Sequence, residues 1–256
     1  MPSPKKTYHA PAVEKAFRLL RRVADADEAP RLSDLAGQLN ISKGSAHGLI
    51  GALLSAGALV QDTKKRLSLG PAMVELALKD RTYLTLGLRA QPALDKLQNT
   101  IHETVFFGMM YPWQALIMAA SEARNPMKIS SQPGSTIPLL AGALGKLYLS
   151  GMDDGQVKEI IKEKGLPAYT PASIADEKTY LNEVARVRST GYAVDRGEYM
   201  SGVNALAVDV GDHYRQPLAL WVVGFSGSLD EQKIGRIKDE VLAAAFRLGK
   251  DLGADV

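Results

Sequence analysis

Three helical segments followed by a hairpin place the strongest constraint on the fold of the first 69 residues. Apolar residues recur at helical spacing in APAVEKAFRLLRRVADA and in LSDLAGQLN, where Ser33 is the expected N-cap. After the short connection ISK, a third helix is expected in KGSAHGLIGALLSAG. Two strand-like runs then flank the polar turn DTKKR. This order predicts a winged helix-turn-helix, a module that typically binds DNA with its third helix.

The third helix carries glycine at positions 44, 48 and 51. Each interior glycine costs a helix about 1 kcal/mol relative to alanine. On a helical wheel they lie opposite the apolar face, which is formed by Ala46, Leu49, Ile50, Leu53 and Leu54. A bare strip of this kind predicts close approach to a large partner such as the DNA major groove. The alternatives are incidental glycines or tight packing against another helix.

Charge is distributed unevenly along the chain. Residues 1–66 have a balance of +5, whereas the rest of the chain has −2, within a net charge of +3. Lys64, Lys65 and Arg66 lie at the predicted wing tip, where phosphates would lie beside them. A solvated turn is the alternative for this triplet. Together, the smooth helix and the basic wing favour DNA binding.

The remaining chain predicts an α+β domain. It mixes amphipathic helices with strand pairs, and 46% of all 256 residues are hydrophobic. Residues 70–101 are expected to be linker helices, with Pro71 in a first turn and Pro92 starting a second helix. We therefore expect a winged helix-turn-helix domain over residues 1–69, which begins with a short basic arm, linker helices over 70–101 and an α+β domain over 102–256. The absence of cysteine excludes disulfides and fits a cytoplasmic protein.

Enzyme motifs fail on their spacing. GALGKL lacks the earlier glycine and the Ser or Thr of a phosphate-binding loop, and GFSGS lacks the closing glycine of a nucleophile elbow. The histidines at 9, 47, 102 and 213 have no metal-binding spacing. We therefore expect no catalysis, cofactor or metal. The main rival is a metabolite sensor or interaction protein whose DNA-binding module is degenerate, and a hydrolase is more remote.

Several long segments resemble the IclR family of bacterial transcription regulators. They include VEKAFRLL, LSDLAGQLNISKGSAHGLIGALLSAGALVQD, RLSLGPAMVELA, LAGALGKLYL, YTPASIADEKTYLNEVARVRSTGYAVDRGEYMSGVNALAVDV and WVVGFSG. The resemblance implies a winged helix-turn-helix joined by a linker helix to a GAF-like α+β domain that binds a small metabolite. It also implies a homodimer on a double-stranded operator, often paired into a tetramer.

The third helix departs from the family pattern. That pattern usually has serine and threonine after the lysine and arginine after the histidine, whereas here Gly44 and Ser45 follow Lys43, and Gly48 follows His47. Losing that arginine removes a phosphate or guanine contact, for which Lys43, the wing or Arg22 must compensate. The expected DNA-binding residues are Arg22, Ser42, Lys43, Ser45, His47, Lys64, Lys65 and Arg66.

The resemblance also implies the residues of the ligand pocket. They are Leu139, Leu140, Gly142, Ala143, Asp195, Ala205, Gly224 and Ser226. Asp195 and Ser226 match the family, although each could instead be structural, as a turn-stabilising carboxylate and a strand-end serine. Ala205, Gly224, Gly142 and Leu140 replace a cysteine, a serine, a common threonine and a common histidine.

These replacements predict a roomier and less polar pocket than one made for glyoxylate or pyruvate. We therefore expect an aromatic or comparable medium-sized organic acid. Its carboxylate would bind the Gly142 and Ala143 amides, and a polar substituent would meet Asp195 or Ser226.

Overall fold

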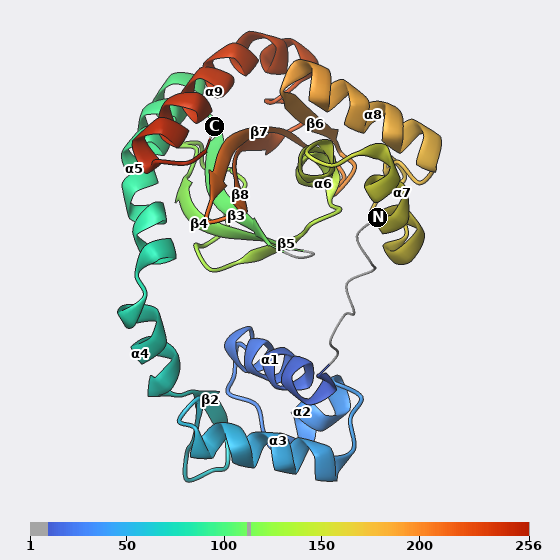
Figure 1. The fold of residues 1–256 in the computed structure, drawn as a ribbon. Helices are drawn as coiled ribbons and strands as arrows, with labels where there is room; N and C mark the ends of the chain where they lie inside the picture. Colours follow the sequence, from blue (N-terminus) through green and yellow to red (C-terminus); the bar gives the residue numbers. More distant parts are fainter. Residues whose placement is uncertain (1–9, 112–113, 256) are drawn as a thin grey trace. The chain divides into compact units, whose positions relative to one another are not determined.

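The computed structural model describes residues 10–111 and 114–255, so the expected N-terminal arm and the turn at 112–113 lie outside the described residues. The chain divides into two compact units, Met1–Arg81 and Thr82–Val256 (Figure 1). The division falls inside the segment 70–101, which we expected to act as one linker. Its first helix belongs to the N-terminal unit and its second helix to the C-terminal unit.

The N-terminal unit has the expected helix-turn-helix and wing. Its elements are α1 (Pro11–Ala24), α2 (Leu32–Gln38), α3 (Lys43–Ser55), β1 (Leu59–Gln61), β2 (Leu67–Leu69) and α4 (Pro71–Lys79). Helices α1, α2 and α3 and both strands each bury at least one apolar side chain in a common core. Its members include Leu19, Leu35, Ile50, Leu59 and Leu67. Burying these faces together stabilises helices too short to persist alone.

Two local predictions, one in each unit, are wrong. Helix α2 begins at Leu32 with Arg31 as its N-cap residue, because the Asp34 carboxylate accepts a hydrogen bond from the Arg31 backbone N–H; Ser33 instead donates to Asp34. Pro92 lies inside α5 (Thr82–Ile101) and does not begin a helix. Proline removes one backbone hydrogen bond there, but the buried face of α5, which includes Leu94, keeps the helix continuous.

The C-terminal unit is built on a six-stranded antiparallel sheet in the order β5-β4-β3-β8-β7-β6. The strands are β3 (Thr104–Tyr111), β4 (Gln114–Ser121), β5 (Thr136–Pro138), β6 (Tyr192–Arg196), β7 (Val203–His213) and β8 (Gln216–Phe225). The remaining helices are α6 (Gly142–Ser150), α7 (Asp154–Lys164), α8 (Glu177–Thr190) and α9 (Glu231–Leu252). Figure 1 shows α5 and α9 side by side on one side of the sheet, away from α6.

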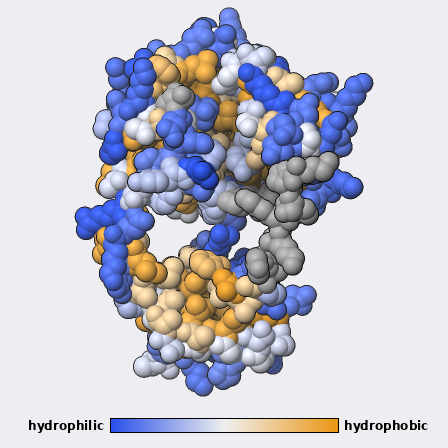
Figure 2. All heavy atoms as spheres, viewed as in Figure 1, coloured by the Kyte–Doolittle hydropathy of each residue, from blue (hydrophilic) through white to orange (hydrophobic). Residues whose placement is uncertain are grey.

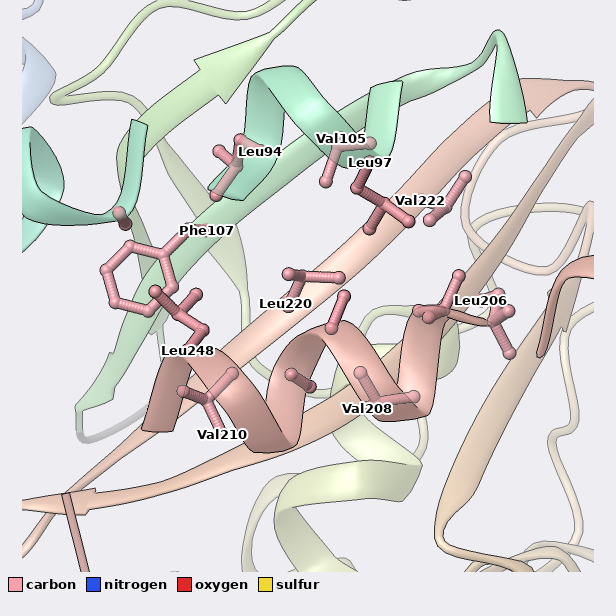
Figure 3. Close-up of a cluster of buried hydrophobic side chains, with 14 of the residues drawn as sticks. Leu94, Leu97, Val105, Phe107, Leu206, Val208, Val210, Leu220, Val222 and Leu248 are labelled. Carbon is pink, nitrogen blue, oxygen red and sulfur yellow. The ribbon is translucent and has the colours of Figure 1, made fainter. Parts of the chain in front are cut away.

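Alternating side chains divide the sheet between two cores. On the α5 and α9 face, the main cluster includes Leu94, Phe107, Leu220, Val222 and Leu248 (Figure 3). The other face carries a second cluster with α6, which includes Phe106, Leu144 and Trp221. Along a regular stretch of strand, the parity of a residue therefore decides which core it joins, whereas the irregularity at Met118 in β4 places Ile117 and Ala119 in different cores.

Helix α5 lies unusually close to β4. A Cβ on Gly87 would overlap the backbone carbonyl oxygen of Met118, so a larger residue would force the helix away from the strand. The next residue back along β4, Ile117, is buried in the second cluster on the opposite face.

The fold class predicted from the sequence is confirmed. Within the described residues, no helix is long and apolar enough to cross a membrane.

Candidate functional sites

The three glycines of α3 form an open strip. Gly44, Gly48 and Gly51 are exposed, and no described atom outside the helix lies within 4 Å of a Cβ built on any of them. Packing against another helix of this chain therefore does not explain these glycines. The N-terminus of α3 is stabilised by a cap, because the Ser42 hydroxyl oxygen accepts a hydrogen bond of 3.2 Å from the Ser45 backbone N–H. Ser42 is thus an N-cap in addition to a predicted DNA contact.

Exposed polar side chains lie on the same unit as this strip. Lys43 and His47 lie exposed on α3, and Arg22 lies exposed on α1. In the wing, Lys64 and Lys65 are exposed, and Lys65 has a positive φ of 60°.

An aspartate shapes the wing turn. Asp62 Oδ1 accepts hydrogen bonds from the backbone N–H groups of Lys64 (2.9 Å) and Arg66 (2.7 Å). Arg66 differs from the two lysines, because its guanidinium forms an ion pair with Glu28 at 3.1 Å. Among the described residues, the wing therefore offers two ammonium groups without an ion-pair partner and one guanidinium that is paired with Glu28.

Apolar side chains are also exposed on the N-terminal unit. They include Val13 and Phe17 on α1 and Val74, Leu76 and Leu78 on α4, each more than half exposed. Figure 2 shows hydrophobic side chains gathered on this unit. A gathering of exposed apolar residues on one unit is typical of a protein–protein contact surface.

A cavity of about 240 Å³ lies on the α6 face of the sheet in the C-terminal unit. It is called the ligand cavity below. Its walls come from β3, β4, β5, β6, β7, β8, α6 and two loops: Phe106, Ile117, Ile129, Ser130, Ser131, Thr136, Ile137, Ala141, Ala143, Leu144, Asp195, Tyr199, Met200, Val203, Ala205, Trp221 and Val223. Most of these side chains are apolar, and none of the described lining residues is a lysine, arginine or histidine. The volume exceeds that of a cavity of about 150 Å³ that can hold benzene.

Asp195 is the charged residue among those described in the lining. It is 5% exposed, and its carboxylate accepts backbone hydrogen bonds from Glu198 (2.6 Å) and Tyr199 (3.3 Å). Burial raises the pKa of Asp195 to about 6 from 3.8, although these hydrogen bonds oppose the shift. Its carboxylate packs against Gly142, where φ is +51° and any Cβ would overlap it.

A buried lysine supports this wall of the cavity. Lys146 of α6 is fully buried, and its Nζ donates to the Val194 carbonyl (2.5 Å) and to Glu198 Oε1 (2.6 Å). The carbonyl of Glu198 in turn accepts hydrogen bonds from the hydroxyls of Thr170 and Ser173. This network fixes the loop that carries Tyr199 and Met200 into the lining.

The structure brings together part of the predicted pocket. Ala143, Asp195 and Ala205 line the ligand cavity, whereas Leu140 and Gly142 line a separate pocket of about 10 Å³. Leu139 is 1% exposed within the second hydrophobic cluster.

Two of the predicted pocket residues lie elsewhere. Gly224 shares the strand parity of Val222, so it faces the α9 side, where a Cβ would lie 2.5 Å from Glu103 Oε2. Ser226 is exposed beyond the end of β8, where its N–H donates to Gly202. Neither residue is part of the described lining.

Sequence reasoning missed most of the apolar lining, including Phe106, Tyr199 and Trp221. Nothing in a single apolar strand distinguishes a residue that lines a cavity from one that fills a core. Lys146 carried a usable signal, because it is the lone charge in the small, apolar helix segment AGALGKLYLSG. Among the described residues, no group of three or more His, Asp or Glu side chains could hold a metal ion.

Both units match known domains. Residues 12–63 match the IclR helix-turn-helix domain, and residues 82–249 match the bacterial transcriptional regulator IclR C-terminal domain. The glycerol operon regulatory protein of Streptomyces coelicolor is 28% identical over 95% of this chain and 96% of its own length.

Solved structures share the fold over nearly the whole chain. An IclR transcriptional regulator from Alicyclobacillus acidocaldarius is 23% identical, with a TM-score of 0.78 over 96% of this chain and all of its own. An IclR homolog from Microbacterium hydrocarbonoxydans, solved with 4-hydroxybenzoate, is 19% identical, with a TM-score of 0.74 over 94% of this chain and 99% of its own. The family matches cover both units in the expected order, and this chain belongs to the IclR family of bacterial transcription regulators.

Proposed function

We propose that this protein is a ligand-responsive regulator that binds operator DNA through α3 and the wing and senses a small organic acid in the ligand cavity. The observation that carries the DNA-binding part is the open glycine strip of α3 beside the exposed Lys64 and Lys65. Such a strip lets the helix backbone approach base edges, while the lysines neutralise phosphates. On this proposal the protein acts in the cytoplasm, where bacterial DNA lies.

In this proposal Ser45 and His47 read bases, whereas Lys43, Lys64, Lys65 and Arg22 contact phosphates. Ser42 supports the helix start that presents Ser45. We assign Arg66 a smaller share than the sequence suggested, because its guanidinium is paired with Glu28.

A gel-shift and salt-titration series on the DNA upstream of its own gene tests this division. His47→Ala is expected to change sequence preference. Lys64→Ala with Lys65→Ala is expected to weaken binding to all sequences and to flatten the salt slope by about 0.9 for each lost phosphate contact. Arg66→Ala is the matched control and should change the slope less. Failure of the unaltered protein to bind any duplex would favour the rival, a sensor with a degenerate DNA module.

The effector part of the proposal rests on the size and lining of the ligand cavity. Phe106, Trp221 and the aliphatic residues suit the faces of one aromatic ring, and the volume of about 240 Å³ leaves room for a substituent. We therefore propose an aromatic acid of one ring or a comparable organic acid. The Microbacterium protein's 4-hydroxybenzoate makes that compound a reasonable first test ligand.

Binding without catalysis is proposed for this cavity, because no nucleophile and base are paired in its described lining. A thermal-shift series from glyoxylate and pyruvate to monocyclic acids tests the size argument. Stabilisation by the two smallest acids alone would contradict it.

We also propose that the protein is a homodimer, with a dimer of dimers as its larger form.

A further inference from the structure

The corner of the cavity where an acid was expected to bind is already occupied by a carboxylate. A ligand carboxylate was predicted to accept from the amides at the start of α6, at Gly142 and Ala143. The Asp195 carboxylate packs directly on Gly142, and both Asp195 and Ala143 line the cavity. A ligand that reaches these amides must therefore meet Asp195.

No cation in the described lining would neutralise a second carboxylate there. The nearby Lys146 is fully buried and committed to Glu198 Oε1 at 2.6 Å and the Val194 carbonyl at 2.5 Å. Its other glutamate neighbour is Glu183 of α8, at 3.7 Å, which also pairs with Arg186 at 2.9 Å. The two cations, Lys146 and Arg186, therefore already face three carboxylates, those of Glu183, Glu198 and Asp195.

Two ionised carboxylates in one poorly solvated site repel each other, and the free energy of this repulsion is large enough that one of them takes up a proton. Asp195 is subject to the charges of Lys146 on α6 and Glu198 in the following loop, and it accepts a hydrogen bond from the backbone N–H of Tyr199. Helix α8 adds Glu183, which contacts Lys146 and pairs with Arg186, and Tyr180, which lies near Glu198. The β7 partner of Asp195, Ala205, is apolar. Burial already brings the pKa of Asp195 to about 6, so protonation near neutral pH costs little.

We propose that the ligand cavity binds its ligand through a hydrogen-bond donor presented to Asp195, so that the bound ligand and Asp195 together carry no more than one negative charge. A neutral hydroxyl or amide compound meets this condition directly. An acid meets it by binding with one added proton, which it shares with Asp195. This inference rests on the proposed effector role of the cavity.

Calorimetry with benzoate and its neutral isostere benzamide tests this inference, because neither probe has a second polar group. At pH 7.5, benzamide is expected to bind at least tenfold more tightly than benzoate. From pH 6 to pH 8, the Kd of benzoate should rise toward tenfold per pH unit, while that of benzamide stays nearly constant. Buffers of different ionisation enthalpy should report uptake of about one proton with benzoate and none with benzamide.

Asp195→Asn removes the competing charge and should bind benzoate more tightly at pH 7.5, with no pH dependence. Asp209→Asn, on β7 outside the described lining, is the matched control and should behave like the unaltered protein. If Asp195→Asn does not fold, the proton count and pH profile of the unaltered protein decide the question.

Two outcomes would overturn the inference in different ways. Benzoate binding with a constant Kd and no proton uptake would reject the role of Asp195 but leave the proposed effector cavity intact. Binding of neither probe at any pH would reject the proposed ligand class itself, and this inference with it.

Discussion

Asp195 is a buried acid whose ionisation opposes folding. Its pKa is about 6 in the folded protein and 3.8 in its ordinary state, so the folded protein holds a proton that the unfolded chain releases. The stabilising contribution is complete below pH 3.8 and is lost as the pH rises through 6. The unaltered protein should therefore lose up to about 3 kcal/mol between pH 4 and 7 relative to Asp195→Asn. Urea unfolding of both proteins across this range measures the difference, and parallel pH profiles would contradict it.

Lys146 forms a buried ion pair, for which the chain offers an exposed counterpart. Lys146→Met leaves Glu198 buried without its partner, which is expected to cost about 3–5 kcal/mol. Lys79→Met breaks the exposed pair with Glu75 on α4 and should cost about 0.5 kcal/mol or less. Urea unfolding at pH 7 compares the two. Similar losses in both variants would show that burial of the Lys146 pair is not the decisive factor.

Single residues of the cavity were only partly predictable. Asp195 was identified because the resemblance fixes its place after the segment YAV, and its parity in β6 directs it to the cavity. The same resemblance misplaced Gly224. Which face a strand residue takes depends on bulges in the sheet, such as those at Met118 in β4 and Val210 in β7, and the sequence does not display them.

At the scale of one helix, a substitution in the glycine strip of α3 should affect stability and DNA binding in opposite directions. Gly48→Ala adds a methyl group in open space, so it should stabilise the N-terminal unit by about 1 kcal/mol through helix propensity. The same methyl group should weaken operator binding if the strip lies against DNA. Gly37→Ala in α2 is the control, since Gly37 is equally exposed and open. Thermal unfolding and gel shifts on both variants give the comparison, and unchanged DNA affinity in Gly48→Ala would contradict close approach.

Elements with strong periodicity were predictable, and those set by tertiary context were not. The amphipathic segments of α1, α8 and α9 carry apolar stripes that indicate both the type and the position of the element. Pro92 was expected to start a helix from local chemistry alone. Burial of one face of α5 on the sheet outweighs the lost hydrogen bond, and only the assembled sheet supplies that burial.

At the scale of the whole molecule, the exposed apolar residues of α1 and α4 predict self-association. We expect sedimentation to show a dimer or larger, and footprints to show paired half-sites about 10 base pairs or a multiple apart. Leu76→Glu, which charges a side chain 64% exposed on α4, should shift the protein toward monomer. Met127→Glu, in the loop between β4 and β5 and 76% exposed, is a matched control for added charge. A dimer unchanged by Leu76→Glu would place the contact elsewhere.

The close contact of Gly87 with β4 has a mechanical consequence. Ile117 lines the ligand cavity, while Met118, the next residue, touches α5 through its carbonyl oxygen. The residue that lines the cavity and the residue that contacts α5 are thus joined by one peptide bond. The contact with α5 is between backbone atoms, so no flexible side chain lies between the strand and the helix. Since α5 begins at Thr82, immediately after the last residue of the N-terminal unit, the helix that contacts β4 is also the first element that follows that unit in the chain.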